Sequence, residues 1–291
     1  MEGSPSIRRS IMRFVRGQVR RIMRPIINRE PNLPAKILAY REDEFDYAIP
    51  KVSRSADGEL PVPPDHLWVA LGPGGYGATP QEYLSLGQKQ VATIHEQLAR
   101  VGGQLQEHGR VLDFGCASGR LIRWFADQAQ SGEVWGVDVD AEHIVWCQQN
   151  LSPPFNFCTT TTAPHLPFED RYFDLVYAGS VFTHIDELAD AWFLELRRVL
   201  RSGGFAFITI NDKHSLGIIQ KNPDFNLAKR IVEAAPRLRL DEVDFSKVTI
   251  GRSHTIYDRD SLIEKLNRWF DVVAIQPEAY GFQTALLLKK R

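Results

Sequence analysis

One short stretch constrains the fold more than any other, because a strand, a turn of small residues and a helix follow one another directly. The apolar pair Val111 and Leu112 predicts a buried strand that ends in Asp113. Apolar residues then recur at helical spacing over residues 121–129. Small residues let a backbone approach a ligand closely, and the first N–H groups of a helix point back into such a turn. The stretch therefore predicts an α/β protein that binds a ligand at this strand end.

Two kinds of ligand could use this turn. A dinucleotide needs the spacing G-x-G-x-x-G, with its pyrophosphate at the helix N-terminus. Here the small residues are Gly115, Ala117 and Gly119, and Asp113 stands two places before the first of them. A carboxylate repels pyrophosphate and suits a ligand that carries an ammonium group. A tight turn in some other α/β protein is the alternative that this motif leaves open.

A second acid ends the next predicted strand, which covers residues 133–140. Asp138 stands 25 residues after Asp113. An acid at this place can accept hydrogen bonds from both ribose hydroxyls. Nicotinamide enzymes and methyltransferases share that feature, so it indicates a nucleoside without deciding which one.

Later motifs follow in a fixed order. Residues 166–176 read Leu-Pro-Phe-Glu-Asp-Arg-Tyr-Phe-Asp-Leu-Val, residues 180–184 read Ser-Val-Phe-Thr-His, and residues 195–204 read Glu-Leu-Arg-Arg-Val-Leu-Arg-Ser-Gly-Gly. Together with the turn, they resemble the class I S-adenosylmethionine-dependent methyltransferases, whose motifs are D-x-G-x-G-x-G, L-P-F-x-D-x-x-F-D-L-V and L-x-R-V-L-K-P-G-G. Ala117 replaces the middle glycine and Ser202 the usual proline. The resemblance covers roughly residues 80–291.

The resemblance implies a three-layer, Rossmann-like α/β fold. Its sheet is mostly parallel, with the strand order 3-2-1-4-5-7-6 and a C-terminal antiparallel hairpin. Sequence patterns predict helices over residues 79–99, 121–129, 141–150, 187–201 and 260–270. After the first two strands, they predict strands over residues 155–158, 173–178, 205–210, 271–275 and 283–288. Residues 211–258 give no clear pattern, and the family commonly shapes its acceptor site there.

The same resemblance implies S-adenosylmethionine as cofactor and in-line methyl transfer as the reaction. Gly115, Ala117 and Gly119 would shape the turn against the methionine part. Asp113 would support that part and its ammonium group, and Asp138 would hold the ribose. Thr162 and Ala163 would lie beside adenine, and Ser180 and Phe182 would form the wall of the reacting centre. Cys116 and Val139 are also expected to contact the cofactor.

A general base is needed only if the acceptor is a poorly ionised hydroxyl or amine. His184 is the candidate, because it follows the fourth strand at the edge where such sheets bind ligands. A structural histidine that orients the loop is the alternative. His214, His254 and Tyr257 are weaker candidates. No metal is expected, since the spacing of Cys116, Cys147 and Cys158 matches no metal-binding motif.

Charge is unevenly distributed along the chain. The net charge is −1, yet residues 1–29 hold eight arginines and one acid, so the remainder carries −8. Residues 6–27 predict a basic amphipathic helix that could lie on an anionic membrane surface. Packing against the chain's own body or a partner, and a disordered or targeting arm, are the alternatives. A connector rich in proline and acids follows, so we expect an arm and connector over residues 1–66 and the methyltransferase domain over residues 67–291.

Composition favours a cytoplasmic protein, and peripheral membrane contact through residues 6–27 is one possibility that the basic segment leaves open. No apolar run is long enough to cross a membrane, and the cysteines fit a reducing compartment. The basic segment lacks an aromatic platform, which argues against nucleic acid. A small-molecule, sugar or lipid-linked acceptor is therefore expected. A non-catalytic scaffold or membrane-associated subunit of the same fold is the alternative, and a nicotinamide-dependent oxidoreductase is the rival enzyme class.

Overall fold

A computed structural model describes residues 60–68, 79–105, 108–221, 247–250 and 254–291, without the side chains of residues 248–250. The chain divides into two units, residues 1–48 with 161–163 and residues 49–160 with 164–291. The fold described below is that of the second unit. The predicted amphipathic helix over residues 6–27 and most of the predicted connector lie outside the described residues, so the expected boundary near residue 66 stays a prediction.

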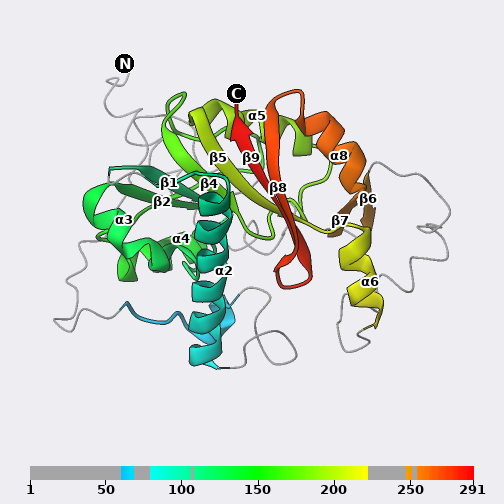
Figure 1. Cartoon of the computed structure of the whole chain (residues 1–291). Coiled ribbons are helices and arrows are strands. Elements are labelled where there is room, and N and C mark those ends of the chain that lie inside the picture. The colour runs from blue at the N-terminus through cyan, green and yellow to red at the C-terminus, as the bar shows by residue number, and fades with distance from the viewer. Residues whose placement is uncertain (1–59, 69–78, 106–107, 222–246, 251–253) are drawn as a thin grey trace, which may run out of the picture. The chain divides into compact units, whose positions relative to one another are not determined.

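Seven strands form one sheet in the order β3-β2-β1-β4-β5-β9-β8 (Figure 1). The first five strands in this order run parallel, whereas β9 is antiparallel to both β5 and β8. The sixth and seventh predicted strands are β8 and β9, so the predicted order is confirmed. The strands are β1 (Arg110–Phe114), β2 (Glu133–Asp138), β3 (Asn156–Thr159), β4 (Phe173–Ala178), β5 (Leu200–Ile210), β8 (Phe270–Tyr280) and β9 (Gln283–Lys290).

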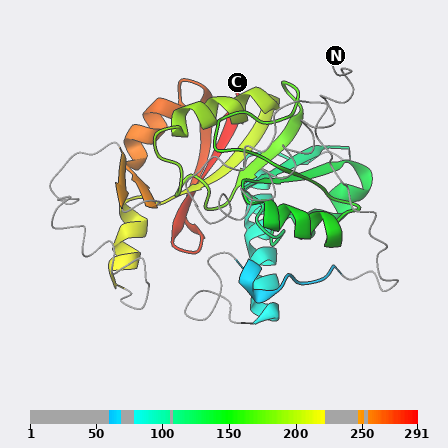
Figure 2. The ribbon, with the colours of Figure 1, turned by 180° about the vertical axis from the view of Figure 1, so that it is seen from behind.

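Helices cover both faces of this sheet. Alternate strand residues point to opposite faces, so Leu112 and Val111 belong to different core clusters. The cluster around Val111 includes residues of α2 (Pro80–Arg100), η3 (Ile122–Phe125), α3 (Ala126–Ser131) and α4 (Ala141–Asn150). The cluster around Leu112 includes residues of α5 (Ala189–Val199) and α8 (Arg259–Leu266). Figure 1 shows α2 in front of the sheet, and Figure 2 shows α5 across the opposite face.

The long helix α2 starts where its sequence predicts. Thr79 caps the helix, because its Oγ1 accepts a hydrogen bond from the Glu82 amide at 3.2 Å while Glu82 Oε2 accepts one from the Thr79 amide at 3.0 Å. Pro80 occupies the first turn, where its missing N–H costs no helical hydrogen bond. This reciprocal cap fixes the start of the helix that later packs against the glycine turn. Among the described residues, no helix is long and apolar enough to cross a membrane.

The structure differs from the sequence prediction in three places. The expected helix over residues 121–129 is a short 3-10 turn, η3, followed by α3. The helix expected to reach residue 201 ends at Val199, and β5 begins at Leu200 instead of residue 205, with Gly203 at a φ of 74° where the pairing with β4 shifts register. The unreadable residues 211–258 contain α6 (Lys213–Lys221) and the hairpin of β6 (Lys247–Ile250) and β7 (His254–Tyr257).

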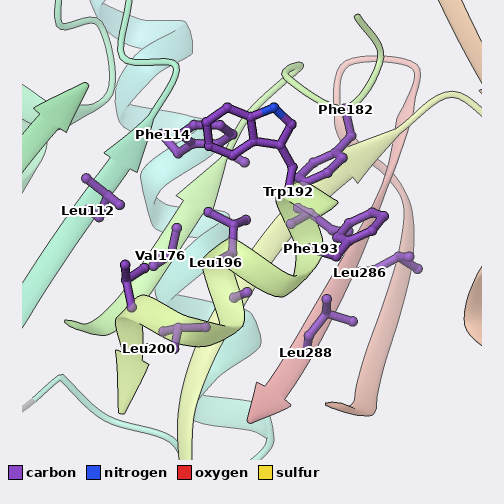
Figure 3. Close-up of a cluster of buried hydrophobic side chains, with 14 of the residues drawn as sticks. Leu112, Phe114, Val176, Phe182, Trp192, Phe193, Leu196, Leu200, Leu286 and Leu288 are labelled. Atoms are coloured by element: carbon purple, nitrogen blue, oxygen red, sulfur yellow. The ribbon is translucent and has the colours of Figure 1, made fainter. Parts of the chain in front are cut away.

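Aromatic side chains fill the core between α5 and the sheet (Figure 3). The ring of Phe193 stacks on Phe182 with centroids 4.1 Å apart, and Trp192 packs on Phe114 at 4.8 Å. Both contacts join α5 to the carboxyl ends of β1 and β4. They therefore hold the backbone on which the residues of the functional site stand.

We predict that Phe193→Ala lowers the free energy of unfolding by about 3–5 kcal/mol, because the ring is 1% exposed and its removal leaves a cavity. Urea unfolding measures this loss. The neighbouring Leu194 is 45% exposed on the same helix, so Leu194→Ala should change stability by less than about 0.5 kcal/mol. Equal losses in the two variants would contradict the packing described for α5.

Candidate functional site

The carboxyl ends of β1, β2 and β4 bring the predicted site residues to one edge of the sheet. The turn after β1 is bonded directly to β2, since the Gly115 and Cys116 amides donate to the Val137 carbonyl at 2.8 and 3.0 Å. The segment after β4 lies against the same turn, because Val181 approaches Gly115. Parallel α/β sheets bind their ligands at this edge.

Two glycines of the turn are required by both conformation and space. Gly115 has a φ of 83°, and a Cβ there would lie 2.4 Å from Val181 Cγ2. Gly119 has a φ of 77°, and a Cβ there would lie 2.3 Å from Leu151 Cδ1. A side chain at either position would clash with these neighbouring side chains and would also strain the backbone. The turn therefore keeps its shape only with glycine at both ends.

Ala117 occupies the middle of the turn with a φ of 44°, in the left-handed region. This conformation costs an alanine about 1 kcal/mol relative to glycine. The residue is partly exposed, so its methyl group has space and the cost lies in the backbone. The Ala117 amide donates to Asp138 Oδ2 at 2.8 Å, and the Cys147 thiol donates to its carbonyl at 3.5 Å. These contacts help to hold the strained residue in place.

Asp113 is the last residue but one of β1, and it is 3% exposed. Neither its Oδ2 nor the hydroxyl of Tyr177, the residue paired with it in β4, makes a hydrogen bond of standard geometry among the described residues, although the two groups lie close enough to interact with each other. Burial raises the pKa of the Asp113 carboxyl to about 8. A buried acceptor without such a bond calls for an explanation, and a ligand donor such as an ammonium group supplies one. The group fits the role expected from the sequence.

Asp138 ends β2 beside the turn and uses both carboxylate oxygens. Oδ2 accepts from the Ala117 amide at 2.8 Å, and Oδ1 accepts from the Asp140 amide at 2.8 Å. Burial raises the pKa of Asp138, while these two N–H groups favour its ionised form. Each oxygen keeps a second lone pair, which a ribose hydroxyl could use. The next residue, Val139, is 39% exposed.

Ser180 follows β4 with a φ of 61° and is held by a ring of polar side chains. Its amide donates to Thr209 Oγ1 at 2.7 Å, and that hydroxyl donates to Gln283 Oε1 at 2.6 Å. Gln283 Nε2 closes the ring by donating to Ser180 Oγ at 2.8 Å. Thr183 adds a hydrogen bond to the Ser180 carbonyl at 2.8 Å. Sequence reasoning missed Thr209 and Gln283, which carry no local signal because β5 and β9 bring them here.

Phe182 does not line the site as the sequence led us to expect. Its ring has no exposed surface and stacks on Phe193 in the core. The expectation that Phe182 lies at the reacting centre is therefore wrong. The Phe182 backbone joins the segment after β4 to β7, because the Tyr257 hydroxyl donates to the Phe182 carbonyl at 3.2 Å.

The hairpin of β6 and β7 lies beside the segment that carries His184. The Thr255 amide donates to the Thr183 carbonyl at 2.8 Å, and the rings of His184 and His254 are 5.6 Å apart between centroids. Burial raises the pKa of Tyr257, whose hydroxyl bonds to backbone carbonyls, so we assign it a structural role. His214 stands apart from this pair and contacts Glu278 Oε1 through Nε2 at 3.0 Å.

Arg120 and Tyr280 were also missed from the sequence. Arg120 donates to the Tyr280 hydroxyl and to Gln90. The Tyr280 ring lies over the end of β4, because a Cβ on Gly179 would come within 2.8 Å of it. A register shift between Gln276 and Tyr280 in the pairing of β8 with β9 accompanies this placement. The final hairpin therefore closes one side of the site.

The remaining predicted residues stay untested. Thr162 and Ala163 follow β3 and are exposed, and their assignment to adenine remains a prediction. Cys116 is buried, like Cys147 and Cys158, and burial raises its pKa. Among the described residues, no group of three or more histidine, cysteine or acidic side chains could hold a metal ion.

Comparison with known proteins identifies the family of the central segment. Residues 112–208 match the family model described as "Methyltransferase domain". An uncharacterized methyltransferase of Schizosaccharomyces pombe is 28% identical over 153 residues, which cover 50% of this chain and 52% of that protein. The ubiquinone/menaquinone biosynthesis C-methyltransferase of Cupriavidus pinatubonensis is 34% identical over 101 residues, which cover 33% of this chain and 40% of that protein. The chain thus spans about half the length of these relatives or less.

A solved structure shows the same fold. The S-adenosylmethionine-dependent methyltransferase of Clostridium acetobutylicum superposes with a TM-score of 0.50 at 16% identity, over 70% of this chain and 91% of that one. At this identity the likeness concerns the fold alone. The matched residues 112–208 begin in β1 and end in β5, so they contain the glycine turn, Asp138 and the segment after β4. Over residues 112–208, the match agrees with the family expected from the ordered motifs.

We predict that Asp113 makes the parent chain lose stability as pH rises from about 4 to 8. The folded pKa of about 8 exceeds the usual 3.8, so the folded state holds the extra proton in this window. Asp113→Asn removes the titrating group. As the pH rises, the variant should therefore gain stability relative to the parent, by up to about 1.4 kcal/mol per pH unit. Urea unfolding between pH 5 and pH 8.5 measures the difference. Asp127→Asn, at an exposed position, is the control, and parallel pH profiles for parent and Asp113→Asn would contradict the prediction.

Proposed function

We propose that this chain, which belongs to the class I S-adenosylmethionine-dependent methyltransferase family, methylates a small-molecule, sugar or lipid-linked acceptor. The observation that carries the proposal is the buried Asp113 carboxyl, whose Oδ2 makes no hydrogen bond of standard geometry among the described residues. It stands beside a glycine turn and one strand away from Asp138. An ammonium group and a ribose on one ligand would use both acids.

The residues at the sheet edge divide the ligand between them. Asp113 would accept from the ammonium group, and the backbone of Gly115, Cys116, Ala117 and Gly119 would follow the methionine part. Asp138 would accept from the ribose hydroxyls, with Val139 beside it. Thr162 and Ala163 are proposed for adenine, and Ser180 for the reacting end. In the family the cofactor is S-adenosylmethionine, whose sulfonium supplies an electrophilic methyl group.

The chain's own contribution to the reaction is orientation and exclusion of water. Holding two reactants in line can lower a barrier by about 7–11 kcal/mol. The polar ring around Ser180 and the contact of Arg120 with Tyr280 give the edge of the sheet a fixed shape. Fixed geometry of this kind is what in-line transfer to a positioned acceptor requires.

His184 is proposed as the general base for an acceptor that must lose a proton. It is exposed at the carboxyl edge, and His254 lies beside it on β7. His184→Asn should cut turnover at least about tenfold, with little change in cofactor affinity, since general bases contribute about 10²–10⁴-fold. His165→Asn, at another exposed histidine, is the control in the same assay. Full activity of His184→Asn would exclude the role.

The proposed acceptor class draws on the names of two relatives and on the basic residues 6–27. The named relatives include a C-methyltransferase of ubiquinone and menaquinone biosynthesis and a fatty-acid O-methyltransferase of Mycolicibacterium smegmatis. Both names concern small or lipid-like molecules, and the basic residues 6–27 could bring such a chain to a membrane surface. A lipid-linked acceptor gains weight if that segment binds anionic vesicles.

A non-catalytic scaffold or membrane-associated subunit of the same fold is the second candidate. It is favoured by the strained alanine in the turn and by the neutral Thr162 at the position proposed for adenine, where a carboxylate would be the stronger acceptor. A nicotinamide-dependent enzyme is disfavoured, because the buried Asp113 would face the pyrophosphate. Binding of S-adenosylhomocysteine separates these possibilities.

We predict that Asp138→Ala weakens the binding of S-adenosylhomocysteine by more than about tenfold, because the ribose loses its acceptor and the Ala117 amide its anchor. Isothermal titration calorimetry measures the change. Asp127→Ala on the exposed side of α3 should bind like the parent. Unchanged affinity of Asp138→Ala would remove Asp138 from the site.

A further inference from the structure

The outer side of the glycine turn is bonded to residues 60–68, which precede the domain's first long helix. The Ser118 hydroxyl donates to the Leu67 carbonyl at 2.6 Å, and the Tyr83 hydroxyl contacts the Ser118 carbonyl at 3.5 Å. Ser118 is 1% exposed and Leu67 4%. Trp68 stacks on Tyr83 with centroids 5.3 Å apart. The 60–68 segment and α2 thus meet on the residue that follows Ala117.

Arg123 makes the second connection between the 60–68 segment and the turn. Its guanidinium donates from Nε to the Gly119 carbonyl at 3.1 Å and from Nη2 to the Pro61 carbonyl at 2.9 Å. The side chain is only 5% exposed, and its guanidinium lies 5.9 Å from the centroid of the Tyr83 ring. Burial lowers its pKa. A buried arginine that spends its donors on two backbone carbonyls fixes the two segments in one geometry.

These contacts lie next to Ala117, whose backbone conformation is strained although its side chain has space. Gly115 and Gly119 adopt left-handed conformations freely, whereas Ala117 does so at a cost. A strained backbone conformation persists only where the surrounding structure determines it. Asp138 holds Ala117 from the amide side, through the bond to its N–H. The next residue, Ser118, is held by its own bond to Leu67, and Gly119 is held by Arg123.

We propose that residues 60–68, acting through Ser118 and Arg123, hold Ala117 in the left-handed conformation that the cofactor turn requires. Arg123 and Ser118 are positioning residues in this account, since neither is assigned a contact with the cofactor. The 60–68 segment supplies rigidity that a glycine at position 117 would make unnecessary. The inference rests on the proposed cofactor site, and it extends that site to a segment outside the sheet.

A double-mutant cycle tests the proposal by calorimetry with S-adenosylhomocysteine. Arg123→Gln should weaken binding at least about tenfold in the parent, a change of about 1.4 kcal/mol. In the Ala117→Gly background the same substitution should weaken binding by less than about threefold, because glycine keeps the turn without help. Ser118→Ala, a milder change, should show the same pattern. Arg100→Gln, at an exposed arginine of α2, is the matched control and should change nothing.

Equal losses in the two backgrounds, or no loss in either, would overturn the proposal. Cooperative thermal unfolding of each variant guards against misfolding. Hydrogen exchange of the amides at residues 117 and 119 provides a readout without cofactor. Arg123→Gln should speed this exchange in the parent and speed it less in Ala117→Gly, and equal acceleration in both would overturn the proposal. A parent chain that binds no S-adenosylhomocysteine would refute the proposed function, while the exchange data would still decide the role of residues 60–68.

Discussion

The hydrogen bond from the Ala117 amide to the Asp138 carboxylate ties together the parts of the molecule that matter for function. It joins the turn after β1 to the end of β2, and it keeps a strained alanine between two obligatory glycines. The sheet makes this bond possible, since parallel pairing brings the two strand ends to one edge. Without it, the turn could relax and Asp113 would stand beside a backbone of undefined shape.

Two carboxyl groups at neighbouring strand ends have different environments. Asp138 accepts two backbone N–H bonds, whereas the Oδ2 atom of Asp113 is buried without a hydrogen bond of standard geometry among the described residues. Burial, together with the nearby negative charge of Asp138, raises the pKa of Asp113 to about 8, which leaves the carboxyl largely neutral near pH 7. A cation that enters the site would favour the ionised form and release a proton. The energetic cost of burying this acid is thus consistent with a role in binding.

Local patterns predicted the parts of the fold that depend on neighbours in sequence. The Thr79 cap, the β1 turn and the apolar run of β4 are each visible in the local sequence. The strand order was predicted from the resemblance to the family. Thr209 and Gln283 could not be found in this way, because their partner Ser180 is distant in sequence and only the sheet brings them together. Phe182 was misassigned, since its position after β4 does not reveal that its ring faces α5.

The most direct test of the account is the pH dependence of S-adenosylhomocysteine affinity, measured by calorimetry on the unmodified chain. Binding of an ammonium group by Asp113 predicts micromolar affinity that strengthens from pH 6 to about pH 8, by up to about tenfold per pH unit, with release of a proton. Affinity that does not change over this range would contradict the role of Asp113. Absence of binding at millimolar concentration would contradict the methyltransferase proposal itself.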